Sequence, residues 1–146
     1  MTAGDVSRPA GRSFKEEHVR RYQATNGEDG YLWNGAPVLL ITTIGRRTGE
    51  LRTTPLVFAT DNERYLVVAS RKGADDHPQW YLNLTAEPQI DVQVLADRFP
   101  ARARTAGEHE KPPLWQKMVD VLPDYDEYQA RTERVIPLVI IDRIHA

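Results

Sequence analysis

Apolar and polar side chains alternate along two neighbouring segments of the chain, residues 89–95 and 98–106. The apolar positions of the two segments are Ile90, Val92, Val94, Phe99, Ala101 and Ala103. An alternation with a period of two is typical of β-strands that have one buried face and one wet face. A two-residue turn at Ala96-Asp97 would place Val94 opposite Phe99 and keep all six apolar residues on one face. The pattern therefore predicts a β-hairpin in this register.

Other apolar runs predict four more strands, at about residues 37–44, 51–59, 64–70 and 135–142. Most of these strands follow one another at short spacing, which favours antiparallel pairing. Strands and helices do not alternate regularly, and this argues against a doubly wound parallel sheet. We therefore expect a mainly β fold with flanking helices, in which the strands form a closed or half-closed antiparallel barrel.

Capping signals and helical spacing predict short helices at about residues 13–25, 78–88 and 112–122, and a last one from residue 124. The first begins with a capping box, Ser13 with Glu16, and its apolar face is weak, so we expect it on the surface. The last carries Tyr125 and Tyr128, which lie three residues apart and therefore share one face.

Composition narrows the class of protein. The 146 residues carry a net charge of −2, with 40% hydrophobic and 27% charged residues, which is typical of one globular domain and argues against a general nucleic-acid binder. The absence of cysteine excludes disulfides and fits a reducing compartment. The N-terminus lacks the apolar run of a secretory signal, and no stretch is long enough to span a membrane. We expect a flexible tail (1–12) followed by a single domain (13–146) in the cytoplasm.

Several common kinds of active site find no support in the sequence. The four histidines are scattered without a His-x-x-x-His pair, and no thiolate is available, so we expect no metal site. The segment from Gly45 to Gly49 matches neither a Walker loop nor the dinucleotide fingerprint. Ser70 does not lie in a G-x-S-x-G elbow, which argues against a hydrolase nucleophile.

Two turns that follow strands concentrate cations among small residues. One holds Arg46, Arg47 and Arg52, and the other holds Arg71 and Lys72. Guanidinium groups match phosphate and carboxylate, and small residues let backbone N–H groups approach an anion. Together with the two tyrosines, these cations are consistent with a site for a planar, anionic ligand that is itself chemically active. Composition alone equally allows five solvated cations and two half-buried tyrosines.

Three motifs, TTIGRRTGELRTTPL, ASRKGADDHPQWYLNLTAEP and PDYDEYQARTERVIP, resemble the deazaflavin-dependent nitroreductase and quinone reductase family. They span about residues 37–141 in the family's order. The resemblance implies a split β-barrel of the flavin-mononucleotide-binding type, with reduced coenzyme F-420 carrying the redox chemistry. It further implies an oxidoreductase that reduces a planar electrophile, most naturally a quinone, with nitroaromatics or activated lactones as further substrates.

The resemblance also implies roles for single residues. Those that would hold the phosphate and the glutamate tail of the coenzyme are Arg47, Arg52, Arg71, Lys72 and Gly73. Those that would line the deazaflavin ring are Thr54, Pro55, Ala69 and Ser70. On the substrate side, Ser70 and Tyr125 would donate hydrogen bonds to the oxygen that gains charge, and Tyr128 would shape the pocket.

The chain departs from the family pattern at three positions. Val57 and Leu122 stand where nitroimidazole-reducing members carry tyrosine, which implies a more apolar and open substrate side. Lys72 stands where members often have a second glycine, which implies a different loop shape or an added charge contact. Three alternatives stay open: a flavin-mononucleotide oxidoreductase on the same barrel, a non-catalytic coenzyme carrier, and a small nucleic-acid-binding barrel, against which the acidic net charge argues. We expect a monomer or a homodimer, with peripheral contact at the inner face of the cell membrane as an option.

Overall fold

The computed structural model describes residues 14–145. The predicted tail and Ser13 of the predicted capping box therefore lie outside the described residues. The helices are α1 (Phe14–Ala24), α2 (Gln79–Ala86), α3 (Lys111–Val121) and α4 (Asp124–Ala130), with a short 3-10 turn, η2, at Arg71–Gly73. The strands are β1 (Leu32–Trp33), β2 (Ala36–Ile44), β3 (Leu51–Val57), β4 (Ala59–Asp61), β5 (Arg64–Val68), β6 (Gln89–Val94), β7 (Asp97–Thr105) and β8 (Leu138–Arg143).

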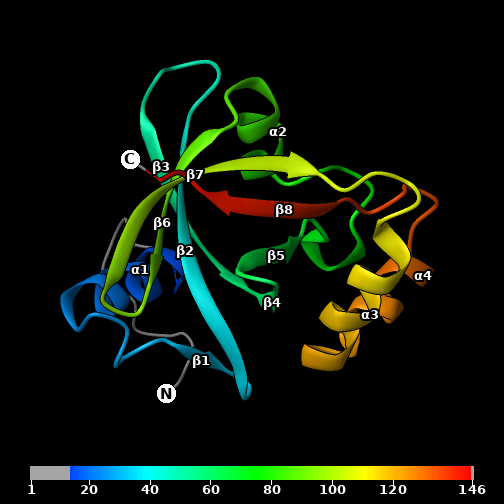
Figure 1. The fold of residues 1–146 in the computed structure, drawn as a ribbon, viewed down its shortest axis with the longest axis horizontal. Coiled ribbons are helices and arrows are strands. Elements are labelled where there is room, and N and C mark those ends of the chain that lie inside the picture. The colour runs from blue at the N-terminus through cyan, green and yellow to red at the C-terminus, as the bar shows by residue number, and fades with distance from the viewer. Residues whose placement is uncertain (1–13, 146) are drawn as a thin grey trace.

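The strands form one curled antiparallel sheet with the helices around it (Figure 1). Its order is β1-β2-β6-β7-β8-β5-β4, and β3 pairs with the other edge of β2. Helices α3 and α4 lie together on the side of β4, β5 and β8, whereas α1 packs near β3 at the opposite side (Figure 1). The sheet therefore curls into a half-barrel, and the expected antiparallel barrel with flanking helices is confirmed.

The register predicted for the β6–β7 hairpin is wrong by two residues. Val94 pairs with Asp97 and Val92 pairs with Phe99, so the turn consists of Leu95 and Ala96. Leu95 adopts a left-handed conformation (φ 56°), and its N–H donates to the Tyr22 hydroxyl at 2.8 Å. A contact from α1 thus holds a turn that the local sequence does not favour. Because the slip is two residues, the apolar side chains keep the predicted face.

Two predicted strands have different limits in the structure. The run at 51–59 divides at Phe58, because β3 pairs with β2 whereas β4 pairs with β5. The N–H of Phe58 donates to the carbonyl of Pro37 at this transfer between partners. The closing strand begins at Leu138, since the N–H of Ile136 donates to the Gln129 side chain and not to a neighbouring strand.

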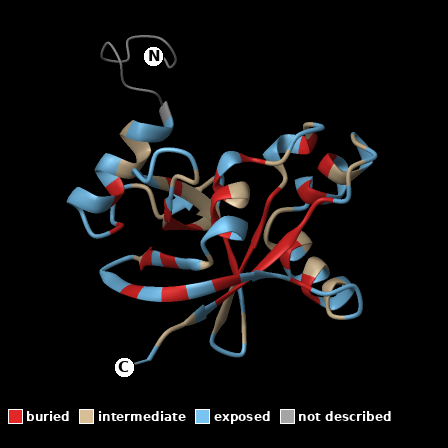
Figure 2. Cartoon of the chain, turned by 90° about the horizontal axis from the view of Figure 1, so that it is seen from above, coloured by how far each residue is buried: buried red, intermediate tan, exposed pale blue. Residues whose placement is uncertain are grey.

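Strands β5 and β8 are buried on both faces, because two apolar cores meet across them. Val67, Val139 and Ile141 point into the barrel core, whereas Leu66 and Ile140 point into a second core under α3 and α4. Figure 2 shows buried positions running along the central strands and exposed faces on the helices. This double burial fixes α4, and with it the two predicted tyrosines, against the sheet.

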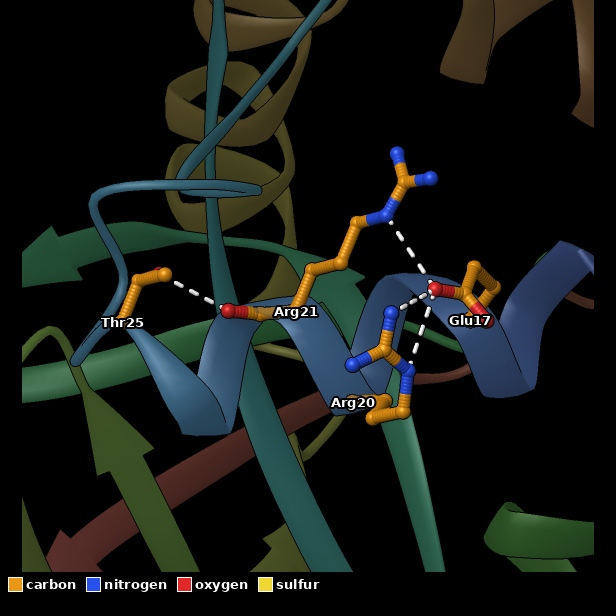
Figure 3. Close-up of polar contacts among 4 residues, drawn as sticks. All are labelled: Glu17, Arg20, Arg21 and Thr25. Carbon is orange, nitrogen blue, oxygen red and sulfur yellow. Dashed lines mark hydrogen bonds and ion pairs between the residues drawn. The ribbon is translucent and has the colours of Figure 1, made fainter.

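Helix α1 is anchored more firmly than its weak apolar face predicts. Tyr22 is fully buried, and its hydroxyl donates to the carbonyl of Val38 at 2.9 Å. On the outer face, Glu17 forms ion pairs with Arg20 and Arg21, as Figure 3 shows. Both arginines are thus engaged within the helix. The helix lies on the surface as expected, and one buried aromatic anchor takes the place of a broad apolar stripe.

Candidate functional site

Two adjoining cavities lie at the mouth of the half-barrel. Their volumes are about 610 Å³ and about 380 Å³. They share four lining residues, Lys15, Thr54, Gln79 and Trp80. Because the shared residues come from α1, β3 and α2, the two cavities form one continuous site between these elements. A ligand that fills both would be elongated.

The larger cavity has mostly apolar walls. Its apolar lining comes from β1, β2, β3, β5, α2, α4 and the residue after α3, and comprises Trp33, Val38, Pro55, Leu56, Val57, Val68, Trp80, Leu122, Tyr125 and Tyr128. Its polar lining includes Ser70, Arg71 and Lys72 from the turn after β5, and His18 from α1. A space with apolar and aromatic sides and a cationic margin is suited to a flat ring that carries an anionic extension.

The smaller cavity is lined by the tip of the β2–β3 hairpin, where the three arginines differ in role. Arg46 is fixed to α2, since its guanidinium donates to Asn83 Oδ1 at 2.8 Å and to Gln79 Oε1 at 2.9 Å. Arg47 is exposed and lines the cavity. Arg52 also lines it and pairs with Glu50 at 3.2 Å on the surface. Arg47 and Arg52 are therefore the arginines of this tip that can turn to an anion.

The turn after β5 has a backbone shape that suits an anion. Ser70 is right-handed (φ −81°, ψ −40°), whereas Arg71 and Lys72 are left-handed, with φ of 47° and 55°. Successive N–H groups in such a right-then-left arrangement form an anion-binding concavity called a nest. Within residues 14–145, the N–H groups of Ser70, Arg71 and Lys72 donate to no acceptor. We call these three N–H groups the nest.

The nest belongs to a loop, residues 69–77, that is fastened by a residue from elsewhere in the chain. The guanidinium of Arg134 donates to the carbonyls of Ala69 (3.1 Å), Ser70 (2.8 Å) and Ala74 (2.9 Å). It also donates to Nδ1 of His77 at 2.9 Å. The sequence analysis did not single out Arg134. The only local signal is a charged residue just before an apolar strand, and nothing in the spacing links it to a loop some sixty residues earlier.

The two predicted tyrosines lie side by side in the larger cavity. Their ring centroids are 6.0 Å apart at an interplanar angle of 80°, and both residues are buried. The Tyr125 hydroxyl forms no hydrogen bond with any residue in the described range. Burial raises the pKa of Tyr125, and so do the neighbouring Tyr128 and Asp124. A buried phenol without a partner at a cavity wall is available to donate to a ligand.

The other predicted site residues divide into lining and supporting positions. Thr54, Pro55, Ser70, Arg71 and Lys72 line a cavity, whereas Ala69 and Gly73 do not. Ala69 is fully buried in the barrel core. At Gly73 (φ 81°) a Cβ atom would come within 2.5 Å of the Tyr128 carbonyl oxygen, so only glycine fits there.

Helix α1 adds two lining residues that were not predicted as site residues, Lys15 and His18. Nε2 of His18 lies 2.8 Å from the carbonyl oxygen of Gly30, which fixes the ring. The pKa of Lys15 is lowered, first because surrounding protein displaces water and also because the charge of Arg52 lies nearby. Among residues 14–145 no group of His, Asp and Glu side chains could hold a metal ion. No helix in that range is long and apolar enough to cross a membrane.

A half-barrel with an apolar cavity, a nest and exposed arginines is the kind of fold and site that suits a flat ring with an anionic tail. The model of the F-420H(2)-dependent quinone reductase family matches residues 14–143. The chain belongs to this family, and it is therefore an oxidoreductase whose cofactor is reduced coenzyme F-420.

Relatives and solved structures agree with this assignment. The F-420H(2)-dependent quinone reductase Rv1261c of Mycobacterium tuberculosis is 37% identical over 94% of this chain and 95% of its own. A second protein of that organism, the putative F-420H(2)-dependent quinone reductase Rv3178, is 40% identical over 72% of this chain and 88% of its own.

Two of the similar solved structures are close enough in sequence to bear on more than the fold. An F-420-H2-dependent reductase (FDR-A) is 37% identical, with a TM-score of 0.68 over 73% of this chain and 94% of that one. A structure described as a domain-swapped dimer is 35% identical, with a TM-score of 0.70 over 86% of this chain and 95% of that one. The heme storage protein HutZ of Vibrio cholerae, at 14% identity and a TM-score of 0.61, shares the fold alone. The predicted split-barrel class is confirmed.

Proposed function

We propose that this protein catalyses the transfer of hydride from reduced coenzyme F-420 to a quinone, with nitroaromatics or activated lactones as further substrates. The observation that carries the proposal is the continuous site. Its apolar cavity is lined by the nest residues and by a buried phenol with no partner among residues 14–145, and it adjoins a smaller cavity lined by Arg47 and Arg52. The coenzyme supplies the hydride when bound. The quinone takes up that hydride and a proton to become the hydroquinone.

We assign different residues of the site to different parts of the coenzyme. The nest, with the side chains of Arg71 and Lys72, would hold a phosphate group, because three N–H donors there lack acceptors. Arg47 and Arg52 would hold the carboxylates of the glutamate tail in the smaller cavity. Thr54 and Pro55 would contact the deazaflavin ring, which carries this anionic tail. The roles earlier assigned to Ala69 and Gly73 would be those of backbone support, since neither lines a cavity.

On the substrate side, residues of this chain would orient the quinone and polarise its carbonyl group. Tyr125 would donate to the quinone oxygen that gains negative charge, because its hydroxyl is buried and has no other partner in the described range. Ser70 lines the same cavity, and its hydroxyl would be the second donor. The ring of Tyr128 packs edge-on against Tyr125 and would fix its direction. The raised pKa of Tyr125 keeps the phenol protonated, so it acts as a hydrogen-bond donor.

The apolar lining supports a quinone as the preferred acceptor. Val57 and Leu122 line the larger cavity at the positions where nitroimidazole-reducing members carry tyrosine. Neither side chain can donate a hydrogen bond to a nitro group. We therefore propose that quinones are reduced well and nitroimidazoles poorly.

A binding titration separates this function from its alternatives. Purified protein is titrated with coenzyme F-420, flavin mononucleotide and NADPH while fluorescence is followed, and reduction of menadione by the reduced coenzyme is then measured. Tight binding of F-420 alone, with turnover, supports the proposal. Preference for flavin mononucleotide would favour the flavin alternative, and binding of F-420 without turnover of any quinone would favour a carrier.

Assembly and location are further proposals. A homodimer is supported by the relative whose structure is described as a domain-swapped dimer, whereas a monomer is the alternative. We propose a cytoplasmic enzyme and keep peripheral contact with the inner face of the membrane as a prediction. Size-exclusion chromatography with light scattering checks the first point, and sedimentation with lipid vesicles checks the second.

A further inference from the structure

Arg134 lies between α4 and β8 and contacts the 69–77 loop without lining either cavity itself. Its guanidinium donates four hydrogen bonds, three to carbonyl oxygens and one to His77, at distances of 2.8 to 3.1 Å. We propose that Arg134 is a positioning residue that holds the nest in its anion-binding shape. This inference rests on the proposed function only for the identity of the anion, the phosphate of the coenzyme.

Peptide geometry explains how Arg134 acts on donors that it does not touch. A trans peptide unit is planar, and its C=O and N–H point in opposite directions. Arg134 binds the carbonyl of Ala69, so the N–H of Ser70 points away from the guanidinium. It also binds the carbonyl of Ser70, so the N–H of Arg71 points away as well. Two of the three nest donors are thereby directed to the side of the loop that lines the cavity.

The backbone conformation of this loop needs stabilising contacts from outside the loop. Arg71, Lys72 and Gly73 are left-handed in succession, with φ of 47°, 55° and 81°. A side chain disfavours this conformation, and a strained backbone persists only where surrounding contacts determine it. Inside the turn, the N–H groups of Gly73 and Ala74 close back on the carbonyls of Ser70 and Arg71. Arg134 supplies the contacts from outside, because its planar fork reaches several carbonyls at once.

Neighbouring residues join the same loop to the helix that carries the tyrosines. Arg131 donates to the carbonyl of Lys72 at 3.3 Å, and Thr132 donates to Asp75 at 2.8 Å. Gly73 packs against the backbone of Tyr128. The nest and the Tyr125–Tyr128 pair are therefore parts of one packed unit. Arg134 forms four side-chain hydrogen bonds within this unit. Substitution of Arg134 should therefore change the affinity for the coenzyme more than it changes the rate of the reaction at the substrate side.

The test compares Arg134→Gln and Arg134→Lys with the control Arg102→Gln. Arg102 is an exposed arginine on β7 whose side chain forms no hydrogen bond or ion pair within residues 14–145. Three quantities are measured: the Kd for coenzyme F-420, turnover at saturating reduced coenzyme, and amide hydrogen exchange of Gly73 and Ala74 relative to core amides of β5 and β8. We expect Arg134→Gln to raise the Kd by about tenfold or more. Turnover at saturation should stay within about threefold, and exchange should rise only in the loop.

Arg134→Lys decides between positioning and simple attraction of an anion. Lysine restores the charge but not the planar fork, so a positioning role predicts a Kd close to that of Arg134→Gln. Recovery of wild-type affinity in Arg134→Lys would overturn the proposal. So would faster exchange throughout β5 and β8 in both variants, which would show general structural support, or an unchanged Kd in both. If the wild type does not bind F-420, the proposed function fails, and local exchange in the loop still decides the role of Arg134.

Discussion

Asn83 accepts two hydrogen bonds from Arg46 through one oxygen, from the backbone N–H at 3.2 Å and from the guanidinium at 2.8 Å. Asn83 is buried, and its amide nitrogen lies 3.4 Å from the hydroxyl of Thr43. Helix α2 therefore clamps the base of the β2–β3 hairpin tip. The arginine that follows, Arg47, starts from a fixed backbone and can reach towards the smaller cavity.

This clamp predicts that Arg46 and Asn83 act as one unit in coenzyme binding. Asn83→Ala and Arg46→Ala should each weaken F-420 affinity by several-fold, because either change frees the hairpin tip. The double variant should be little worse than either single variant, since contacting residues are not additive. Titration of all three variants measures the coupling. Fully additive losses would mean that Arg46 contacts the coenzyme itself and that the clamp is not its role.

Arg52 should contribute to coenzyme binding through its charge. A charge-assisted hydrogen bond contributes on the order of 1.5–3 kcal/mol when it is well desolvated. The side chain of Arg52 is 56% exposed and already pairs with Glu50, so we expect Arg52→Ala to weaken affinity by about tenfold, or about 1.4 kcal/mol. The loss should shrink as salt is raised. Arg102→Ala is the control, and an equal effect from it would remove the hairpin tip from the site.

The sequence predicted the parts of this fold that depend on local pattern. Strand faces, the apolar stripe of α3 and the pairing of Tyr125 with Tyr128 follow from periodicities of 2 and 3.6. The hairpin register failed because its turn is held by Tyr22, seventy-three residues away from Leu95 in the chain. The hydrogen bonds of Arg134 to the 69–77 loop were missed for the same reason, since its partners lie some sixty residues earlier. Contacts between residues this far apart in the chain produce no periodic pattern in a single sequence.

At the site, too, the sequence could not predict which cations are held by contacts with distant residues. The sequence predicted one cluster of three equivalent arginines, Arg46, Arg47 and Arg52. In the structure, Arg46 differs from the other two because its guanidinium is bound to Asn83 on α2. Lys15 belongs to the helix that was expected to lie on the surface, yet it lines both cavities. Residue type predicts an anion site, but only the packing of α1 and α2 shows that Arg46 is held by α2 and that Lys15 lines both cavities.

His77 should make stability depend on pH in the weakly acidic range. Nδ1 of His77 accepts from Arg134, and the pKa is lowered below 6.5, first by burial and then by the charge of Arg134. The unfolded chain therefore binds a proton that the folded chain resists, and the free energy of unfolding falls as pH drops below 6.5. Asp76 acts in the opposite direction. His77→Gln, which keeps an acceptor, should flatten this fall.

Urea unfolding at a series of pH values from about 7.5 to about 5 measures this dependence. The comparison of interest is the slope of unfolding free energy against pH in the wild type and in His77→Gln. His109→Gln is a matched control, because His109 is exposed on the surface. Identical slopes in the wild type and His77→Gln would show that His77 is not the group responsible.

Tyr125 should act on the substrate and not in holding the coenzyme. Its hydroxyl is buried at the wall of the larger cavity and has no partner among residues 14–145. The nest residues line the same cavity, and we expect their N–H groups, not the phenol, to hold the anionic part of the coenzyme. A donor that meets developing charge stabilises the transition state more than the ground state. Tyr125→Phe should therefore lower turnover of menadione while leaving the Kd for F-420 nearly unchanged.

The size of the loss in turnover depends on how far water is excluded from the larger cavity. Loss of one donor to an oxyanion can cost on the order of a hundredfold in rate, and access of water to the open cavity would reduce this to about tenfold. Tyr128→Phe is the matched control, because we expect its ring and not its hydroxyl to matter, so its turnover should change less. Steady-state reduction at saturating reduced coenzyme is paired with a binding titration for each variant. If Tyr125→Phe keeps full turnover, or loses activity only through weaker coenzyme binding, Tyr125 is not the donor to the developing charge.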